Sequence, residues 1–95
     1  MTDNLMEAVF MALEEYSGKD VLVFHIRRDL HIAPIGFFTW DSYTHCETTL
    51  ASLREDGWNK KDIKDLRNQA VRVLIKEDDC GKFTTELLDN NNKNL

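Results

Sequence analysis

The stretch VLVFHI, residues 21–26, decides the fold because it is apolar on both of its alternating faces. β-branched and aromatic residues favour strands, and a strand that is apolar on both faces is typically buried on two sides or runs beneath a helix. The charged triplet RRD at residues 27–29 follows it. The sequence therefore predicts a buried strand that ends near residue 26.

The segment before this strand has the periodicity of an amphipathic helix. Its apolar residues recur at three- and four-residue steps: Leu5, Met6, Val9, Phe10, Leu13 and Tyr16. Asn4 with Glu7 three residues later fits an N-terminal cap, and Ser17-Gly18 fits a helix end. We expect a helix over residues 4–17.

A second extended run, over about residues 31–39, follows the buried strand. It contains Pro34 and Gly36. Because proline cannot donate a hydrogen bond to a neighbouring strand, we expect this strand to lie at a sheet edge or to bend. The two runs together predict a β-hairpin.

From Trp40 the apolar spacing becomes helical again. The residues at three- and four-residue steps are Tyr43, Cys46, Leu50 and Leu53, with Thr39 or Asp41 available as N-cap. This pattern predicts a second helix over about residues 41–56.

The end of that helix has a well-defined local signal. Gly57 can adopt the left-handed conformation after a helix, and Trp58 can then close against Leu53. Asn59 with Asp62 three residues later indicates a new N-cap. We expect a third helix to begin near Lys60, directly after a tight turn.

Two interpretations remain open for the far end of the third helix. The interpretation that we favour continues the helix to about residue 76, and the alternative is a third strand over about residues 71–76, because apolar residues alternate there. A short helix over 83–88 is expected after Gly81, followed by a disordered polar tail over 89–95.

These elements predict a single α+β domain over residues 1–88. The expected order is α-β-β-α-α, and the helices pack on one face of a small antiparallel sheet. A chain of 95 residues has no material for a second core.

Composition excludes several classes of function. The net charge of -5 argues against bulk attraction to nucleic acid or anionic lipid. No run reaches the roughly 18 apolar residues of a membrane span, and the N-terminus lacks the features of a signal peptide. Cys46 and Cys80 lack the repeated spacing of a disulfide framework, so we expect free thiols and a cytoplasmic protein that does not contact the membrane.

The low net charge hides an internal asymmetry. Residues 58–76 carry six basic and two acidic side chains, a local charge of +4, which leaves -9 for the rest of the chain. The basic members are Lys60, Lys61, Lys64, Arg67, Arg72 and Lys76. Lys60, Lys64 and Arg67 follow at i, i+4 and i+7, so they share one helix face. Together with Lys61 and Arg72 they are the candidate contacts for phosphates or for a partner's carboxylates. A solvated, salt-bridged face is the alternative interpretation.

Neither catalysis nor metal binding has a signature in this sequence. His45 and Cys46 are adjacent, so on a helix their side chains diverge. His25 and His31 flank the hairpin turn, but no Cys-x-x-Cys or His-x-x-x-His pair accompanies them. We expect Cys46 in the core and Cys80 more exposed. No metal, no cofactor and no enzymatic activity are predicted.

The acidic part of the chain suggests a further hypothesis. Glu7, Glu14 and Glu15 with the run at residues 77–79 could mimic phosphates and inhibit a nucleic-acid enzyme. Trp58 is expected in the turn or core, or else as an exposed aromatic that binds a partner. The leucines near the C-terminus could form a docking strip or a homodimer contact: Leu87, Leu88 and Leu95.

The function that the sequence favours is a small acidic, non-enzymatic regulatory or interaction module that binds a protein partner. The alternative is a nucleic-acid-binding regulator that uses the second and third helices as a helix-turn-helix-like element. An acidic inhibitor, or DNA mimic, of a nucleic-acid enzyme is the third hypothesis. All three are non-enzymatic.

Overall fold

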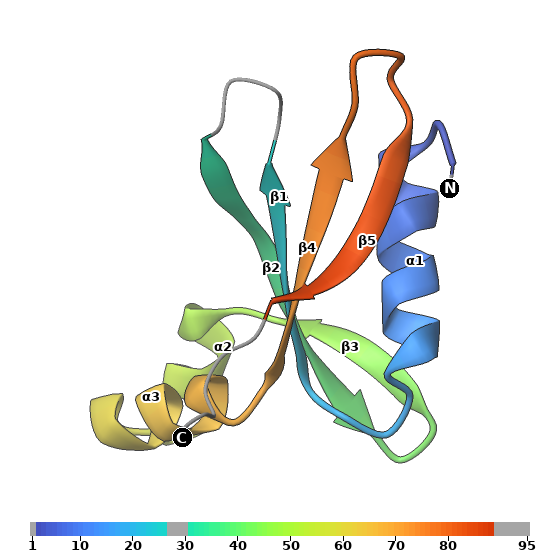
Figure 1. Ribbon diagram of the computed structural model, residues 1–95. Helices are drawn as coiled ribbons and strands as arrows, with labels where there is room; N and C mark the ends of the chain where they lie inside the picture. Colours follow the sequence, from blue (N-terminus) through green and yellow to red (C-terminus); the bar gives the residue numbers. More distant parts are fainter. Residues whose placement is uncertain (1, 27–30, 89–95) are drawn as a thin grey trace, which may run out of the picture.

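The computed structural model describes residues 2–26 and 31–88, which form a five-stranded sheet with three helices (Figure 1). The elements follow one another along the chain as α1 (Leu5–Glu15), β1 (Val21–Ile26), β2 (Ile32–Asp41), β3 (Thr44–Thr48), α2 (Leu50–Glu55), α3 (Lys60–Asn68), β4 (Val71–Glu77) and β5 (Phe83–Leu88). The α+β class is confirmed.

The sheet is mixed rather than antiparallel. Its strand order is β3-β2-β1-β4-β5, and β1 and β4 pair in parallel while all other neighbours are antiparallel. The predicted strand over residues 21–26 is therefore the middle strand, with a partner on each side. Parallel neighbours require a long crossover connection, and here β2, β3, α2 and α3 together supply it.

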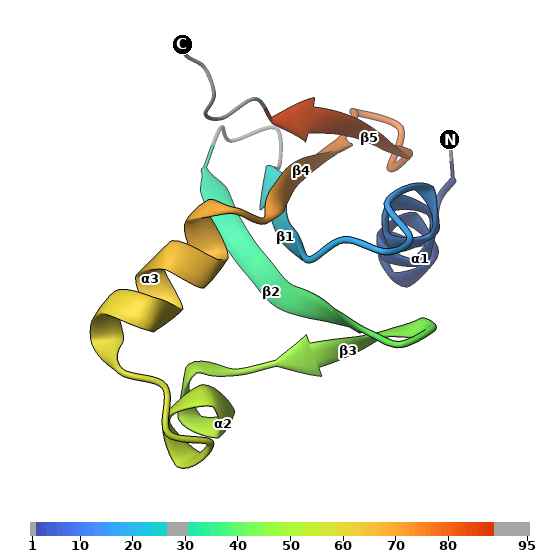
Figure 2. The ribbon, with the colours of Figure 1, turned by 90° about the horizontal axis from the view of Figure 1, so that it is seen from below.

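The helices cover both faces of the sheet, so the expectation of helices on one face was wrong (Figure 2). Val21 and Val23 of β1 pack in a core with α1, whereas Leu22 between them packs in a second core with α2 and α3. Successive side chains of a strand point to opposite faces. The apolar character of VLVFHI on both faces is explained by these two cores.

The prediction of a helix over residues 41–56 was wrong for the first half of this segment. Residues 44–48 form β3, which is joined to β2 by a tight turn where Ser42 has a φ of 63°. Thr39 and Thr48 form a diagonal pair across this hairpin, with their hydroxyl oxygens 2.8 Å apart. Only Leu50–Glu55 is helical, with Thr49 as N-cap instead of Thr39 or Asp41.

The two later helical predictions were also wrong. The third helix ends at Asn68, and residues 71–77 form β4, so the alternative of a strand over 71–76 is correct. Residues 83–88 are a strand, β5, instead of a short helix. Both segments gain a hydrogen-bonding neighbour in the sheet, which local periodicity does not encode. The tail predicted at 89–95 lies outside the described residues.

The effect of Pro34 was predicted in part. β2 lies between β1 and β3, so it is not an edge strand throughout. However, β3 pairs only with residues from Phe37 onward, and the register with β1 shifts opposite Pro34 and Gly36. Proline thus occupies the half of β2 that has one neighbour, where its missing N–H removes no hydrogen bond on the open side.

The turn between α2 and α3 forms as predicted. Gly57 has a φ of 96°, and the amide of Trp58 donates to the carbonyl of Leu53 at 3.0 Å. The amide of Gly57 donates to the carbonyl of Arg54 at 3.1 Å, which completes a Schellman motif. Asn59 Oδ1 accepts from the amide of Asp62 at 2.8 Å and caps α3. The short connection fixes α3 closely beside α2.

Candidate functional site

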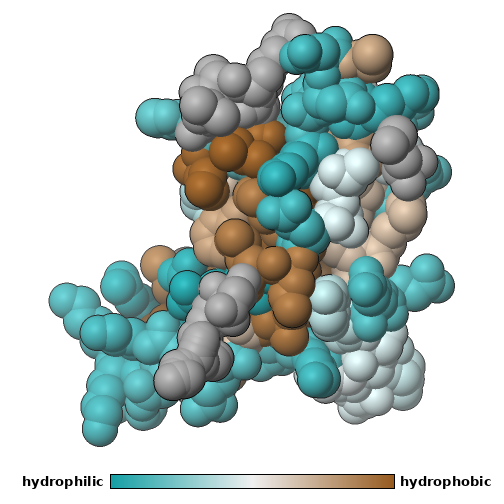
Figure 3. All heavy atoms as spheres, viewed as in Figure 1, coloured by the Kyte–Doolittle hydropathy of each residue, from teal (hydrophilic) through white to brown (hydrophobic). Residues whose placement is uncertain are grey.

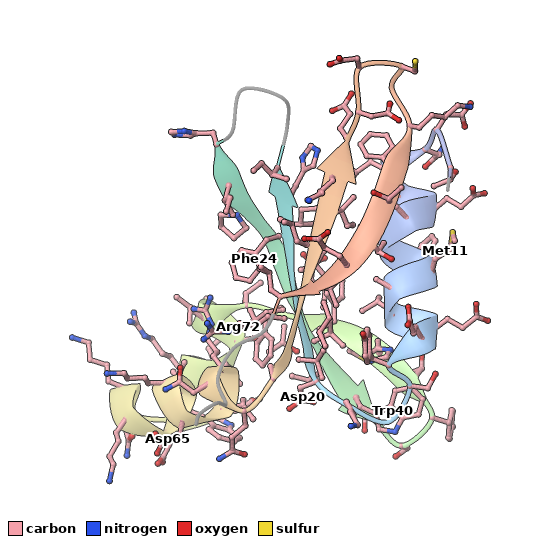
Figure 4. All side chains as sticks on the ribbon, viewed as in Figure 1. Met11, Asp20, Phe24, Trp40, Asp65 and Arg72 are labelled. Carbon is pink, nitrogen blue, oxygen red and sulfur yellow. The ribbon has the colours of Figure 1, made fainter. Side chains whose placement is uncertain are left out.

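A basic pocket lies between α2, α3 and the sheet face formed by β1 and β4. Its volume is about 410 Å³, and its lining consists of Leu22, Phe24, Leu50, Arg54, Lys60, Ile63, Lys64, Arg67, Asn68 and Arg72. Figure 4 shows Phe24 and Arg72 on neighbouring strands, on the side of the sheet where α3 lies. The volume is in the range of ligand-binding pockets, about 300–1,000 Å³.

Five of the lining side chains are basic and come from three elements. α3 contributes Lys60, Lys64 and Arg67, whose spacing places them on one face of the helix. Arg54 comes from the last turn of α2, and Arg72 comes from the start of β4. The tight turn at Gly57 therefore brings Arg54 to the same pocket as the α3 cations.

No acidic side chain among the described residues neutralises the positive charge of this pocket. No carboxylate lines the pocket, and across residues 2–26 and 31–88 none of the five cations forms an ion pair or side-chain hydrogen bond. Asp65 lies on the side of α3 turned away from Arg72 (Figure 4). Five unpaired cations around one cavity create a local positive potential that attracts an anionic group.

Arg72 also has a donor atom that no described residue uses. Its Nε atom is buried and has no hydrogen-bond partner among the described residues. A buried donor without an acceptor costs about 1–3 kcal/mol. An oxygen of a bound anion that reached the guanidinium would supply the missing acceptor.

The inner wall of the basic pocket is apolar. Leu22 and Ile63 are buried, Phe24 is half-buried, and Leu50 is 46 % exposed. On the side of the molecule that Figure 3 shows, hydrophobic residues gather in the middle, and hydrophilic residues lie at lower left, where α2 and α3 are. An anionic group accompanied by an apolar or aromatic group matches this lining better than a fully hydrated anion does.

The structure brings together four of the six site residues that the sequence suggested. Lys60, Lys64, Arg67 and Arg72 line the basic pocket, whereas Lys61 is exposed outside its lining. Trp58 is 39 % exposed and lines a separate shallow cavity with Asp56, Gly57 and Asp62. Trp58 therefore does not line the basic pocket.

Six of the ten lining residues were not assigned to a site from the sequence, and two of these, Arg54 and Phe24, contribute a charge and an aromatic ring. Arg54 lies six residues before Lys60, in the other helix, and Phe24 lies in the distant strand β1. The Schellman signal at Gly57 could have indicated Arg54, because a tight turn brings the end of one helix close to the start of the next. No local signal identifies Phe24, which belongs to the site only through the sheet.

The histidine and cysteine residues form no recognisable reactive centre. Among the described residues no group of three or more His, Cys, Asp or Glu side chains is arranged to hold a metal ion. His45 Nε2 lies 2.8 Å from the carbonyl oxygen of Lys19, and His25 Nε2 lies 3.7 Å from Glu77 Oε1. Cys46 is exposed on β3, so the prediction of a core position was wrong, whereas Cys80 is exposed as expected. Both thiols are free.

The acidic side chains are spread over other parts of the surface. Glu7, Glu14 and Glu15 are exposed on α1, and Asp78 and Asp79 are exposed in the turn between β4 and β5. Asp78 Oδ1 accepts from the amides of Cys80 and Lys82, each at 2.9 Å, so its side chain organises that turn. The basic pocket is therefore a localised positive site on an acidic protein.

Comparisons with protein-family models, curated proteins and solved structures find no match to this chain. Among the described residues, no helix has the length and apolar character needed to cross a membrane. Function is therefore inferred from the geometry of the pocket.

Proposed function

We propose that this chain is a small non-enzymatic interaction module that binds an acidic segment of a protein partner at the basic pocket. The observation that carries the proposal is the set of five unpaired cations around a partly apolar cavity. Carboxylates of a partner would pair with these side chains, and an apolar group beside them would contact the inner wall. The negative charge of the rest of the surface favours a partner that docks locally.

A binding assay with matched charge variants tests this proposal. The probe is a short fluorescent peptide rich in glutamate, and its binding is followed by anisotropy. The variant Lys60→Glu/Lys64→Glu reverses two exposed cations of the pocket, and Lys61→Glu/Lys82→Glu reverses two exposed cations outside it. Both variants change the net charge equally.

The pocket variant is expected to lose about tenfold or more in affinity, because charged groups in close contact contribute more than distant ones. The control variant is expected to change far less. Equal losses in both variants would mean that the peptide responds only to overall charge, and the proposal would fail.

Single-stranded nucleic acid is the second candidate, supported by one specific observation. The half-buried ring of Phe24 lies in the same pocket as the five cations, and proteins that bind single strands combine basic grooves with aromatic rings on which bases stack. Binding of a DNA duplex by a recognition helix is supported less. Lys60, Lys64 and Arg67 line a cavity, whereas the contact residues of a recognition helix enter the major groove.

The same anisotropy assay separates the two candidates. A single-stranded oligonucleotide would show affinity that falls steeply with salt, because each phosphate contact releases counterions. Tight binding of the oligonucleotide together with no binding of the acidic peptide would replace the proposed function with the second candidate.

A further inference from the structure

A second cavity adjoins the basic pocket and has a different lining. This apolar pocket has a volume of about 240 Å³ and is lined by Leu22, Pro34, Ile35, Gly36, Phe37, Thr48, Leu50 and Arg67. Leu22, Leu50 and Arg67 line both pockets, so the two cavities meet at these side chains. Together they extend from β4 across β1 to β2 and the end of β3.

The two halves of this combined groove differ in charge. The basic pocket has five cations, while Arg67 is the one charged side chain among the described residues that line the apolar pocket. Pro34, Gly36 and Phe37 supply much of the surface of the apolar half. A ligand that fills both halves must therefore be acidic at one end and apolar at the other.

We infer that the groove binds a linear segment of a protein partner in which acidic residues adjoin a bulky apolar side chain. The carboxylates would lie in the basic pocket, and the apolar side chain would enter the apolar pocket past Arg67. This inference rests on the proposed function and specifies the partner that the function requires.

The charge pattern favours such a segment over a nucleic acid strand. A strand carries a phosphate at every nucleotide, so one that continued into the apolar pocket would bring phosphates to a surface with one cation. A peptide can change from acidic to apolar within one or two residues. The groove changes its lining over a similarly short stretch, at Leu22, Leu50 and Arg67.

Leu50 is the residue best placed to test the apolar half. It is the first residue of α2, it is 46 % exposed, and it lines both pockets. Because Leu50 is not part of either buried core, Leu50→Ser is expected to leave the fold intact. Leu87→Ser is the matched control, since Leu87 is 59 % exposed on β5 and lines neither pocket.

The experiment compares two peptides on three proteins. One peptide is acidic throughout, and the other carries the same acidic residues followed by a phenylalanine. Binding is measured by anisotropy for the natural chain, Leu50→Ser and Leu87→Ser, and a two-dimensional NMR spectrum of each protein verifies its fold.

The phenylalanine is expected to raise the affinity of the natural chain about tenfold or more, from burial of an aromatic side chain. Leu50→Ser should reduce this gain, and Leu87→Ser should preserve it. If the acidic peptide binds and phenylalanine adds nothing, the inference fails and the proposed function stands. If neither peptide binds, both fail.

Two other outcomes would also overturn the inference. An equal gain in Leu50→Ser and the natural chain would place the phenylalanine elsewhere. Binding of a single-stranded oligonucleotide more tightly than the phenylalanine peptide would assign the groove to nucleic acid.

Discussion

The helices that pack on the two faces of the sheet differ in length and in the size of the core that they cover. α1 has eleven residues and closes a core of nine buried side chains, whereas α2 and α3 have six and nine residues and share a core of five. Longer apolar stripes bury more surface, and burial supplies most of the stability of a small domain. The short helices leave the basic and apolar pockets open beside them.

The helices on the two faces of the sheet also differ in the charge of their exposed side chains. α1 exposes Glu7, Glu14 and Glu15 toward solvent, while α3 directs Lys60 and Lys64 to the basic pocket. Packing against α1 stabilises the sheet, and the opposite face, which α2 and α3 cover incompletely, carries the proposed recognition surface.

The largest expected effect comes from a cavity in the α1 core. Ile75 is fully buried on β4, so Ile75→Ala should lower the free energy of unfolding by about 3–5 kcal/mol. Leu53 is 5 % exposed in the smaller core, which also contains Leu22, a residue that lines both pockets. Leu53→Ala should cost about 2–3 kcal/mol, because the surroundings can relax more easily. Urea unfolding of both variants measures the difference, and a larger loss from Leu53→Ala would contradict the comparison.

The second effect concerns the glycines that follow a helix on each face. Gly57 has a φ of 96° and Gly18 has a φ of 89°, and a Cβ at either position would meet no atom within 4 Å. Gly57→Ala and Gly18→Ala should therefore each cost about 1–2 kcal/mol from backbone strain alone. Only Gly57→Ala should also weaken binding of an acidic peptide, because this turn positions Arg54 relative to Lys60. Equal binding by both variants would show that the turn does not organise the pocket.

The third comparison is between the N-caps of α1 and α3. Asn4 Oδ1 accepts from the amide of Glu7 at 3.0 Å, and Asn59 Oδ1 accepts from that of Asp62 at 2.8 Å. Replacing either asparagine by alanine should cost about 1 kcal/mol. Hydrogen exchange should show local opening of α3 in Asn59→Ala, since this helix has one buried residue, Ile63. α1 has four buried residues, so Asn4→Ala should open it less. The opposite order would mean that α3 is held by more than its small core.

Features that depend on a few neighbouring residues could be predicted from the sequence. The turn at Gly57 and the cap at Asn59 are specified by hydrogen bonds within a few residues, and both form as predicted. VLVFHI identified the buried strand, because a strand apolar on both faces must be covered twice. Each of these signals comes from residues that lie within the segment that forms the feature.

Features that depend on distant partners could not be predicted. Tyr43 and Cys46 fall at helical spacing, yet Tyr43 is 85 % exposed and Cys46 is exposed, so their spacing reflects no buried stripe. Residues 71–77 become a strand because β1 and β5 pair with them on either side. Propensity is a weak signal where tertiary pairing decides the conformation.

The candidate site shows the same division. The spacing of Lys60, Lys64 and Arg67 predicted that they share a face, and all three line the basic pocket. Their meeting with Arg72 and Phe24 depends on the pairing of β1 with β4, which brings two segments far apart in the chain into register. A charge count along the sequence therefore locates four of the ten lining residues, and the fold brings the others to them.

The smallest expected effect is a gain in stability on removing charge from the basic pocket. Lys64 follows Lys60 by four residues and precedes Arg67 by three, and each such like-charge pair on a helix costs about 0.2–0.5 kcal/mol. Lys64→Gln should therefore stabilise the protein by about 0.5 kcal/mol at low salt while weakening binding of an acidic peptide. Lys61→Gln is the control, because Lys61 has a like charge three residues on, at Lys64, and an opposite charge four residues on, at Asp65, so its removal should change stability little. Thermal unfolding at low and high salt measures both variants, and screening should reduce both effects. A loss of stability in Lys64→Gln would mean that the Lys64 charge is already compensated. The proposed binding face would then not differ from the α1 face by an uncompensated positive charge.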